Sequence, residues 1–373
     1  MAAMQEAARE SAREREVVRE EAAATLVAAQ GVLQAAERER LDTQAAGAAQ
    51  ARWGRQVRVL FYGELEAATD GFSLERRIGV GGFGSVFLAV LAGVGECAVK
   101  RLAEGSLQGQ LEFLQEIQVM GGCRHENLLP LLGFAADRAA DQAPGGVGGG
   151  VCLVSPLMKG GSLEDRIFPL ADGASARLKL LGVAPGPLMW DVRLRIGAEV
   201  AAAMEYLHSG EAETHKPQFL HRDVKPANVL LHADLHARLG DLGLARAQVG
   251  GTHVTTLLAG TGGFLDPNCS ITGHFDASSD GYAFGVMLLM LLTGRRAFEG
   301  GETLIDFCSD LGVDVLADAR CGWPLSVAAE VLAVAQGLVM TPRKKRITTA
   351  EARARLQAAA APPPDQGGAV ERE

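Results

Sequence analysis

The order of two hydrophobic periodicities constrains the fold of this chain more than any other feature. Short segments of strand-like character come first, at residues 77–78, 86–90, 97–100 and 152–154. Helical spacing of apolar residues appears once among them, over 107–117, and dominates later, as in 194–207. Strands followed by helices predict an α+β chain with a small sheet-rich lobe carrying one helix and a larger helical lobe.

Composition excludes several classes of protein. With 48% hydrophobic and 22% charged residues in 373, the chain has the composition of a globular protein. The net charge of −9 argues against a nucleic-acid partner, because neutralising phosphates requires clustered Lys and Arg. No apolar run reaches the roughly 18 residues of a membrane span, and residues 1–20 lack the apolar core of a secretory signal. Six cysteines without a C-x-x-C pair favour a reducing compartment, the cytoplasm, over a disulfide framework or a zinc site.

Composition also divides the chain into segments. Residues 1–52 are rich in Ala, Glu and Arg and contain no proline, which predicts a helical or partly disordered arm. Leu26 and Leu33 lie one heptad apart, but the repeat does not continue, so a solvated helix is the simpler interpretation. Self-association through this arm is a hypothesis that rests on its helical composition only. An entry segment at 53–71 precedes the mixed region at 72–357. Two stretches without a clear period are interpreted as surface insertions, and a proline run predicts a disordered tail; these lie at 144–150, 172–187 and 358–373.

A glycine-rich stretch marks a candidate phosphate site. Gly79, Gly81 and Gly84 follow the pattern G-x-G-x-x-G, in which backbone N–H groups approach phosphate oxygens without a Cβ in the way. The same pattern occurs in dinucleotide-binding folds and in ordinary turns. A dinucleotide site would begin a helix at the last glycine, whereas residues 86–90 are strand-like, so we expect the glycines in a hairpin turn.

The next predicted strand ends at Lys100, within Cys97-Ala98-Val99-Lys100. A lysine at a strand end is usually just solvated, but after a glycine hairpin it can reach the phosphates of a nucleotide. Such a lysine needs an orienting carboxylate, and Glu116 on the following amphipathic stretch is the candidate. From spacing alone Glu116 is an exposed helical acid; only the rest of the set favours a pair with Lys100.

The most specific block is His221-Arg222-Asp223-Val224-Lys225-Pro226-Ala227-Asn228, which matches H-R-D-x-x-x-x-N without a gap and is followed by Leu239-Gly240-Asp241-Leu242-Gly243. Catalysis of phosphoryl transfer consists mainly of positioning and charge neutralisation, and these residue types suit it. Asn228 and Asp241 offer hard oxygen ligands for Mg²⁺. Asp223 can accept the proton of a hydroxyl or aim that hydroxyl, and Lys225 can stabilise the transferring phosphoryl group.

With these motifs the chain resembles a eukaryotic protein kinase from about residue 72 to residue 356, and most of all the receptor-like/Pelle branch, which includes receptor-like cytoplasmic kinases. The likeness to that branch rests on residues 61–72, 125–128, 188–208 and 260–265. Residues 279–286 match the family's buried helix. There the resemblance assigns Asp280 to hold the backbone of the catalytic loop, with a helix N-cap as the other interpretation.

The resemblance implies a two-lobed fold, with an N-lobe at about 72–155, a C-lobe at about 159–357 and ATP in the cleft between them. Mg²⁺, or Mn²⁺ in its place, would accompany the nucleotide. Residues 156–158 would form the hinge, with Ser155 gating the pocket behind the adenine. The residues expected to contact the nucleotide are Ile78, Gly79, Gly81, Gly82, Phe83, Gly84, Val86, Ala98, Lys100, Glu116, Pro156 and Met158.

The same resemblance implies a serine/threonine kinase of cytoplasmic signalling with proteins as substrates, since Lys225 and Thr261 favour Ser or Thr over Tyr as the acceptor. Arg222 precedes the catalytic Asp, which implies control by a phosphate on the activation segment. An upstream kinase or a second copy of the chain would add it. The candidate acceptors are Thr252, Thr255 and Thr256.

Two departures from the family pattern leave alternatives open. Asp266-Pro267-Asn268 stands where the family has Ala-Pro-Glu, so we expect the ion pair of that Glu with a late arginine, here Arg346, to be lost and the substrate-docking segment to be softer. Leu242 replaces the usual Phe after Asp241. A pseudokinase that binds nucleotide as a scaffold is the alternative function, and a small-molecule kinase on a related fold is a second alternative.

Overall fold

The computed structural model describes residues 57–81, 84–102, 107–136, 151–171, 173–184, 186–210, 216–248, 254–255 and 261–360. The predictions for the arm at 1–52 and for the insertion at 144–150 lie outside these residues. By their contacts the residues form two compact units. The first comprises residues up to 121 together with 130–156, and the second comprises 122–129 together with residues from 157 onward.

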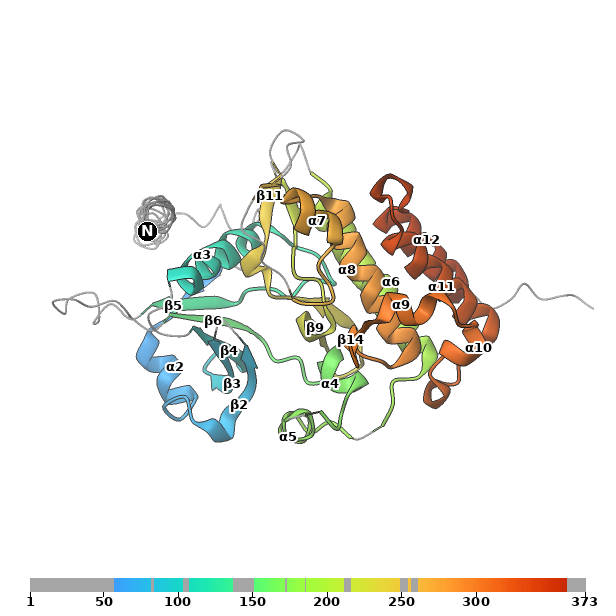
Figure 1. The fold of residues 1–373 in the computed structure, drawn as a ribbon. Helices are drawn as coiled ribbons and strands as arrows, with labels where there is room; N and C mark the ends of the chain where they lie inside the picture. The colour runs from blue at the N-terminus through green and yellow to red at the C-terminus, as the bar shows by residue number, and fades with distance from the viewer. Residues whose placement is uncertain are drawn as a thin grey trace, which may run out of the picture. The chain divides into compact units, whose positions relative to one another are not determined.

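The first unit is built on a six-stranded sheet in the order β1-β5-β6-β4-β3-β2 (Figure 1). Neighbouring strands are antiparallel except β1, which runs parallel to β5. The predicted strands and the predicted helix at 107–117 are confirmed. The elements are β1 (Arg58–Val59), α2 (Tyr62–Ala68), the 3-10 helix η1 (Leu74–Arg76), β2 (Arg77–Gly81), β3 (Gly84–Leu91), β4 (Gly95–Leu102), α3 (Leu107–Gly122), β5 (Gly133–Ala136) and β6 (Val151–Pro156).

The entry segment and the residue that follows it contribute to the core of this unit. Leu65 on α2 is fully buried and, together with Phe72, belongs to a cluster that includes Phe87 and Val99 of the sheet. The rings of Phe72 and Phe87 meet edge to face, with centroids 5.4 Å apart. The hydroxyl of Thr69 donates to the Leu65 carbonyl at 2.7 Å and accepts the Phe72 N–H at 3.1 Å, which fastens the end of α2. Because side chains alternate along a strand, residues between these core positions lie on the other face of the sheet.

The second unit is mainly helical, as predicted. Its short strands pair as β10-β9-β7, β11-β8, β12-β13 and β14-β15. The elements are β7 (Gly161–Ser162), α4 (Leu163–Ile167), α5 (Ala174–Leu180), α6 (Trp190–His208), β8 (Gln218–Leu220), η3 (Pro226–Asn228), β9 (Val229–Leu231), β10 (Ala237–Leu239), η4 (Leu242–Leu244), β11 (Arg246–Gln248), β12 (Val254–Thr255), α7 (Pro267–Thr272), β13 (His274–Phe275), α8 (Ala277–Thr293), β14 (Phe298–Glu299), β15 (Glu302–Thr303), α9 (Leu304–Ser309), α10 (Val313–Leu316), η5 (Ala319–Cys321), α11 (Leu325–Val339), η6 (Arg343–Lys345) and α12 (Thr349–Ala360).

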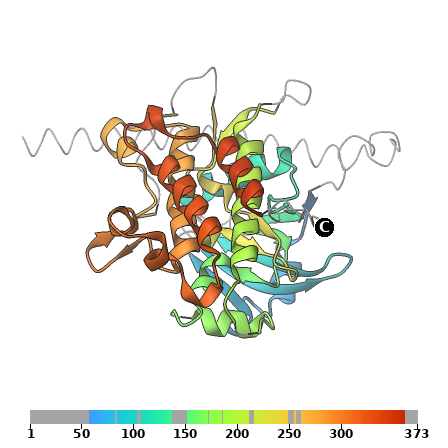
Figure 2. The same ribbon diagram turned by 90° about the vertical axis from the view of Figure 1, so that its right-hand side faces the viewer.

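Helix α8 is the centre of the second unit. Its side chains are buried from Ser279 to the last residue, as expected for a helix that is apolar all around. Asp276 and Ser279 form a capping box at its start, and Gly294 ends it in the left-handed conformation with φ 67°. A Cβ on Gly285 would lie 2.8 Å from the side chain of Val339, so glycine permits the close approach of α11. Helices α6 and α11 pack on α8, and α12 packs on α6 and α11 (Figure 2).

Two boundaries differ from the sequence-based predictions. The stretch at 172–187, predicted as an insertion without a period, contains the seven-residue helix α5. Ala174 and Leu178 are buried one turn apart, and Arg177 forms an ion pair with Asp165 of α4, with Nε 3.0 Å from Oδ2. The predicted disordered tail begins at 358, whereas α12 continues to Ala360. Within the described residues, no helix has the length and apolar character needed to cross a bilayer.

A buried arginine ties three segments of the second unit together. Arg193 on α6 is 1% exposed. Its Nε donates to the carbonyl of Leu188 at 2.9 Å, its Nη1 to the carbonyl of Leu291 on α8 at 2.7 Å, and its Nη2 to Oδ2 of Asp318 at 3.1 Å. Asp318 also accepts hydrogen bonds from the side chain of Arg320 at 2.8 and 2.9 Å.

Replacement of Arg193 by Met should destabilise the protein strongly, because two buried carbonyls would lose their donor and Asp318 would lose its buried cationic partner. We expect the free energy of unfolding in urea to fall by about 3–5 kcal/mol. The matched control is Arg320→Gln, which removes a partner of the same carboxylate from a side chain that is 58% exposed. That variant should lose less than about 1 kcal/mol. Equal losses in the two variants would contradict this account.

Acid should weaken the same network. Burial raises the pKa of Asp318, but hydrogen bonds from Arg320 and the charge of Arg193 outweigh it and lower the pKa to about 2. A lowered pKa contributes stability above the unfolded value near 4, and this contribution is lost as the pH falls towards 2. The contribution is about 2 kcal/mol. Urea midpoints measured from pH 6 to pH 2.5 should therefore fall less steeply for Asp318→Asn than for the wild type.

Candidate active site

The glycine stretch forms the predicted hairpin turn between β2 and β3, in which Gly81 pairs with Gly84. Gly82 and Phe83 lie outside the described residues. Gly84 has φ 150°, and a Cβ there would collide with the carbonyl oxygen of Arg101, so the pairing of β3 with β4 requires glycine. A Cβ on Gly81 would have no atom within 4 Å among the described residues, which leaves space beside its backbone for a ligand.

Three of the predicted nucleotide-contacting residues lie on one face of this sheet. Val86 pairs with Lys100 across β3 and β4, and Ala98 lies two residues before Lys100 on the same strand. This face is opposite to the one that carries Phe87 and Val99 of the core. Ile78 on β2 is half-buried. At the end of β6, Ser155 and Pro156 pair with Ala98 and Cys97. Met158, counted in the second unit, is 5% exposed.

The predicted pair of Lys100 and Glu116 is present. Nζ of Lys100 lies 2.9 Å from Oε2 of Glu116 on α3, and Glu116 is 5% exposed. The alternative of an exposed helical acid is therefore wrong. An ammonium fixed by a buried carboxylate can reach an anion only along a defined direction, because both ends of the interaction are held by regular structure.

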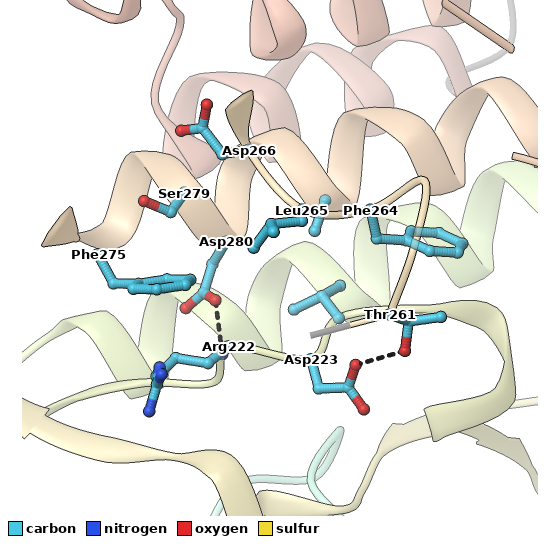
Figure 3. Close-up of a pocket in the computed structure, with 11 residues that line it drawn as sticks. Arg222, Asp223, Thr261, Phe264, Leu265, Asp266, Phe275, Ser279 and Asp280 are labelled. Carbon is cyan, nitrogen blue, oxygen red and sulfur yellow. Dashed lines mark hydrogen bonds between the residues drawn. The ribbon is translucent and has the colours of Figure 1, made fainter. Parts of the chain in front are cut away.

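In the second unit, Asp280 of α8 holds the catalytic loop, defined here as residues 221–228. Its Oδ2 accepts the N–H of His221 at 2.8 Å and a hydrogen bond from Nε2 of His208 at 2.8 Å. Its Oδ1 accepts the N–H of Arg222 at 2.7 Å (Figure 3). Burial would raise the pKa of Asp280, but His208, His221 and the Arg222 N–H lower it. The helix N-cap is Asp276, so the N-cap interpretation of Asp280 is wrong.

Asp280 maintains a strained backbone. Arg222 has φ 69°, a conformation that costs energy in a residue with a Cβ. The loop is also closed by His221, whose Nε2 donates to the Gly240 carbonyl at 3.1 Å while Nδ1 accepts the Asp223 N–H at 3.2 Å. These contacts determine the direction of the Asp223 side chain.

The carboxylate of Asp223 is surrounded by three donors. The Thr261 hydroxyl donates to Oδ1 at 2.9 Å, Nζ of Lys225 lies 2.7 Å from Oδ2, and Nδ2 of Asn228 donates to Oδ2 at 2.9 Å. Nζ of Lys225 also donates to the Thr261 hydroxyl at 2.7 Å. Thr261 begins the segment 261–266, called the docking turn below. A carboxylate, an ammonium and a hydroxyl thus meet at one point. Figure 3 shows the contact between Asp223 and Thr261.

Asn228 and Asp241 lie at the same end of a hairpin. Val229 pairs with Leu239 across β9 and β10, and the Gly240 N–H donates to the Asn228 carbonyl at 2.9 Å. Nδ2 of Asn228 donates to both the backbone oxygen and Oδ2 of Asp223, which directs the carboxamide oxygen away from Asp223. One amide oxygen and one carboxylate suit Mg²⁺, a cation that is held by few protein oxygens. The donor set fits the predicted metal.

A cavity of about 310 Å³, including its open mouth, lies beside Asp223. The docking turn contributes Thr261, Phe264 and Leu265 to its lining, the catalytic loop contributes residues 222–224, and α8 contributes Ser279, Asp280 and Ala283 (Figure 3). The side chains around Asp223 are thus both polar and apolar.

The expected loss of an ion pair at the docking turn is wrong. Arg346 does form an ion pair, but with Asp266: Nη1 lies 2.7 Å from Oδ2 and Nη2 lies 3.0 Å from Oδ1. Asp266 is 1% exposed. Sequence comparison by motif position missed this residue, because the charge lies two positions before Asn268. The sequence also did not predict that His208 would contact Asp280, although residues 188–208 were part of the likeness to the kinase branch.

Comparison with known proteins agrees with this geometry. A model of the protein kinase domain matches residues 72–356. A protein named as a probable receptor-like protein kinase of Arabidopsis thaliana is 38% identical over 63% of this chain and 35% of its own length. In the same plant, Lectin-domain containing receptor kinase VI.3 is 34% identical over 75% of this chain and 38% of its length. Probable serine/threonine-protein kinase PBL23, also of that plant, is 36% identical over 65% of this chain and 57% of its length.

The chain belongs to the protein kinase family, and the three relatives described above are named as receptor, receptor-like or serine/threonine kinases. It spans 57% or less of the length of the three relatives described above.

The strain at Arg222 makes Asp280 a sensitive position. In Asp280→Asn an amide NH₂ group, which is a donor, would face a backbone N–H, which is also a donor. The backbone of the catalytic loop should then leave its strained conformation, and the side chain of Asp223 should shift. Because displacements near 1 Å can cost about 100-fold in rate, we expect kcat for phosphoryl transfer to fall by about that factor. His208→Gln removes one bond from the same carboxylate but keeps both backbone bonds, and should change kcat less than about threefold. Wild-type kcat in Asp280→Asn would contradict this reasoning.

Proposed function

We propose that this chain is an ATP- and Mg²⁺-dependent protein kinase that transfers the γ-phosphate of ATP to serine and threonine hydroxyls of proteins. The triangle of Asp223, Lys225 and Thr261, with separations of 2.7 to 2.9 Å, carries the proposal. It joins a carboxylate, an ammonium and the docking turn at one place. Such an arrangement supports catalysis by orientation and charge neutralisation.

Asp223 would act on the acceptor hydroxyl. A carboxylate offers about four acceptor positions. Among the described residues, Thr261 uses one position on Oδ1, and Lys225 and Asn228 use the two on Oδ2. The second position on Oδ1 can accept a hydrogen bond from a serine or threonine hydroxyl. It would then take the hydroxyl proton as the new P–O bond forms and the bond from the γ-phosphorus to the bridging oxygen breaks, which leaves ADP. The ammonium of Lys225 lies beside this carboxylate, and its positive charge would stabilise the transferring phosphoryl group.

Mg²⁺-bound ATP, when present, supplies the phosphoryl group and neutralises part of its charge. Asn228 and Asp241 would hold the metal through the carboxamide oxygen and the carboxylate. Lys100, oriented by Glu116, would bind phosphate oxygens, and the backbone at Gly81 would lie against them. Ile78, Val86, Ala98, Pro156 and Met158 would contact the adenine and ribose.

The docking turn supports serine or threonine of a protein as the group that accepts the phosphate. Thr261 contacts both Asp223 and Lys225, so the turn that would hold a peptide is hydrogen-bonded to the catalytic carboxylate itself. A short acceptor such as Ser or Thr would reach Asp223 from a peptide lying on this turn. A small-molecule acceptor would need no such turn, which supports a protein substrate.

Control by phosphorylation has a physical basis at Arg222. Burial lowers the pKa of its guanidinium, and the nearby charge of Arg246 lowers it further. A phosphate on the activation segment would bring negative charge to two neighbouring arginines. We assign this role to Thr252, Thr255 or Thr256, phosphorylated by an upstream kinase or by a second copy. The cytoplasm is the compartment we propose, supported by six cysteines that are all buried as thiols and form no disulfide.

The direct test is mass spectrometry of the protein and of a serine peptide library after incubation with Mg²⁺-ATP. We expect phosphate on serine or threonine for the wild type. Asp223→Asn and Lys100→Met should each reduce the rate at least about 100-fold, because each removes a group that acts on the transferring phosphate or the acceptor. Lys179→Met is the control, since it removes the same ammonium from an exposed position on α5.

The proposed function would be refuted if the wild type added no phosphate to itself or to any peptide, both directly and after treatment with an active kinase of the same branch. Binding of nucleotide without transfer would then identify the chain as a pseudokinase. Phosphorylation of sugars or lipids in preference to every peptide would place it among small-molecule kinases.

A further inference from the structure

The family pattern places a Glu at position 268, where this chain has Asn. The carboxylate that contacts the late arginine lies instead at Asp266, the last residue of the docking turn (Figure 3). Arg346 binds it through both terminal nitrogens, at 2.7 and 3.0 Å. A second arginine, Arg343, donates to the same Oδ2 at 2.7 Å. We infer that Asp266 is the positioning residue that anchors the docking turn, in place of the missing Glu.

The contacts of Asp266 with Arg343 and Arg346, called the anchor below, are largely buried, and their positive and negative charges are paired. Asp266 is 1% exposed, the Arg346 side chain is 2% exposed, and the Arg343 side chain is 20% exposed. A buried carboxylate with two fork-shaped partners is held in both position and orientation. Nη1 of Arg343 also contacts Asp276 at 2.9 Å, so two arginines face two carboxylates. Nη1 of Arg346 donates to the Ser278 carbonyl at 3.2 Å, which ties the group to the start of α8.

The side chain of Asn268 has no comparable contact. Its Nδ2 donates to Oδ1 of Asp266 at 3.2 Å, and its backbone N–H donates to the same oxygen at 3.0 Å. Asn268 thus contributes to the anchor as a donor to Asp266, and the backbone bond persists whatever the side chain is. The docking turn is therefore held by two arginines although the residue at 268 is neutral.

The anchor acts on substrate binding through the turn. Thr261 at one end of the turn is hydrogen-bonded to Asp223 and Lys225, and Asp266 at the other end is held by Arg343 and Arg346. Phe264 and Leu265 between them line the cavity beside Asp223. Loss of the Asp266 anchor would free one end of this segment, which should weaken peptide binding more than nucleotide binding. The kinetic part of this inference rests on the proposed function.

Steady-state kinetics with a serine peptide and with ATP test the inference. Asp266→Asn should raise the peptide KM at least about tenfold, because one end of the docking turn is released, while the ATP KM stays within twofold. Asn268→Ala, which removes the side chain at the family's motif position, should leave both constants within twofold. The double variant Asp266→Asn with Asn268→Glu returns the charge to the family's position and should recover most of the peptide KM. Equal effects of Asp266→Asn and Asn268→Ala would overturn the inference.

Two further measurements distinguish a failure of this inference from misfolding of the variant and from a failure of the proposed function. If Asp266→Asn does not fold, Asp266→Glu is compared in its place. A peptide KM raised several-fold with an unchanged ATP KM supports the anchor, and two unchanged constants refute it. If the wild type phosphorylates no peptide, the proposed function has failed, and the anchor is judged by melting temperature alone. Asp266→Asn should then melt at least about 5 °C lower while Asn268→Ala melts as the wild type does; equal melting temperatures would overturn it.

Discussion

One buried carboxylate, that of Asp280, determines the geometry on which the rest of the site depends. It accepts the N–H groups of His221 and Arg222 at 2.8 and 2.7 Å and so holds Arg222 at φ 69°. Asp280 can do this because it belongs to α8, a helix buried along almost its whole length. The free energy gained by burying that apolar helix therefore also maintains the strained loop that presents Asp223. Stability of the core and orientation of the Asp223 carboxylate have the same origin.

The same helix organises the other buried charges of the unit. Arg193 donates to the Leu291 carbonyl near its end, and Arg346 donates to the Ser278 carbonyl at its start. Arg193 also forms an ion pair with Asp318, and Arg346 forms one with Asp266. Each buried charge in these two networks therefore has a partner of opposite sign. The last four carbonyls of a helix have no partner within it, and Arg193 uses one of them. The docking turn and the η5 segment are thereby fixed to the core.

The sequence predicted the parts of this structure that depend on local pattern. Strand and helix periodicity located β2, β3, β4 and α3, and the set of motifs taken together, rather than spacing alone, paired Lys100 with Glu116. Local pattern failed where a contact depends on residues far apart in the chain. Asp266 was overlooked because its partners lie some 80 positions later, and a motif records which residue occupies a position but not which carboxylate an arginine will reach. Helix α5 was overlooked because only Ala174 and Leu178 are buried, too few positions to define a period.

The central proposal is that Lys100 of the first unit and Asp223, Asn228 and Asp241 of the second act on one metal-bound nucleotide. Calorimetric titration with ATP, with and without Mg²⁺, tests it without requiring a substrate. The account predicts a single Mg²⁺-dependent site whose affinity falls in Lys100→Met, which alters the first unit, and whose dependence on Mg²⁺ disappears in Asp241→Asn, which alters the second. Equal affinity with and without Mg²⁺ in the wild type, or a binding curve unchanged by both substitutions, would contradict it.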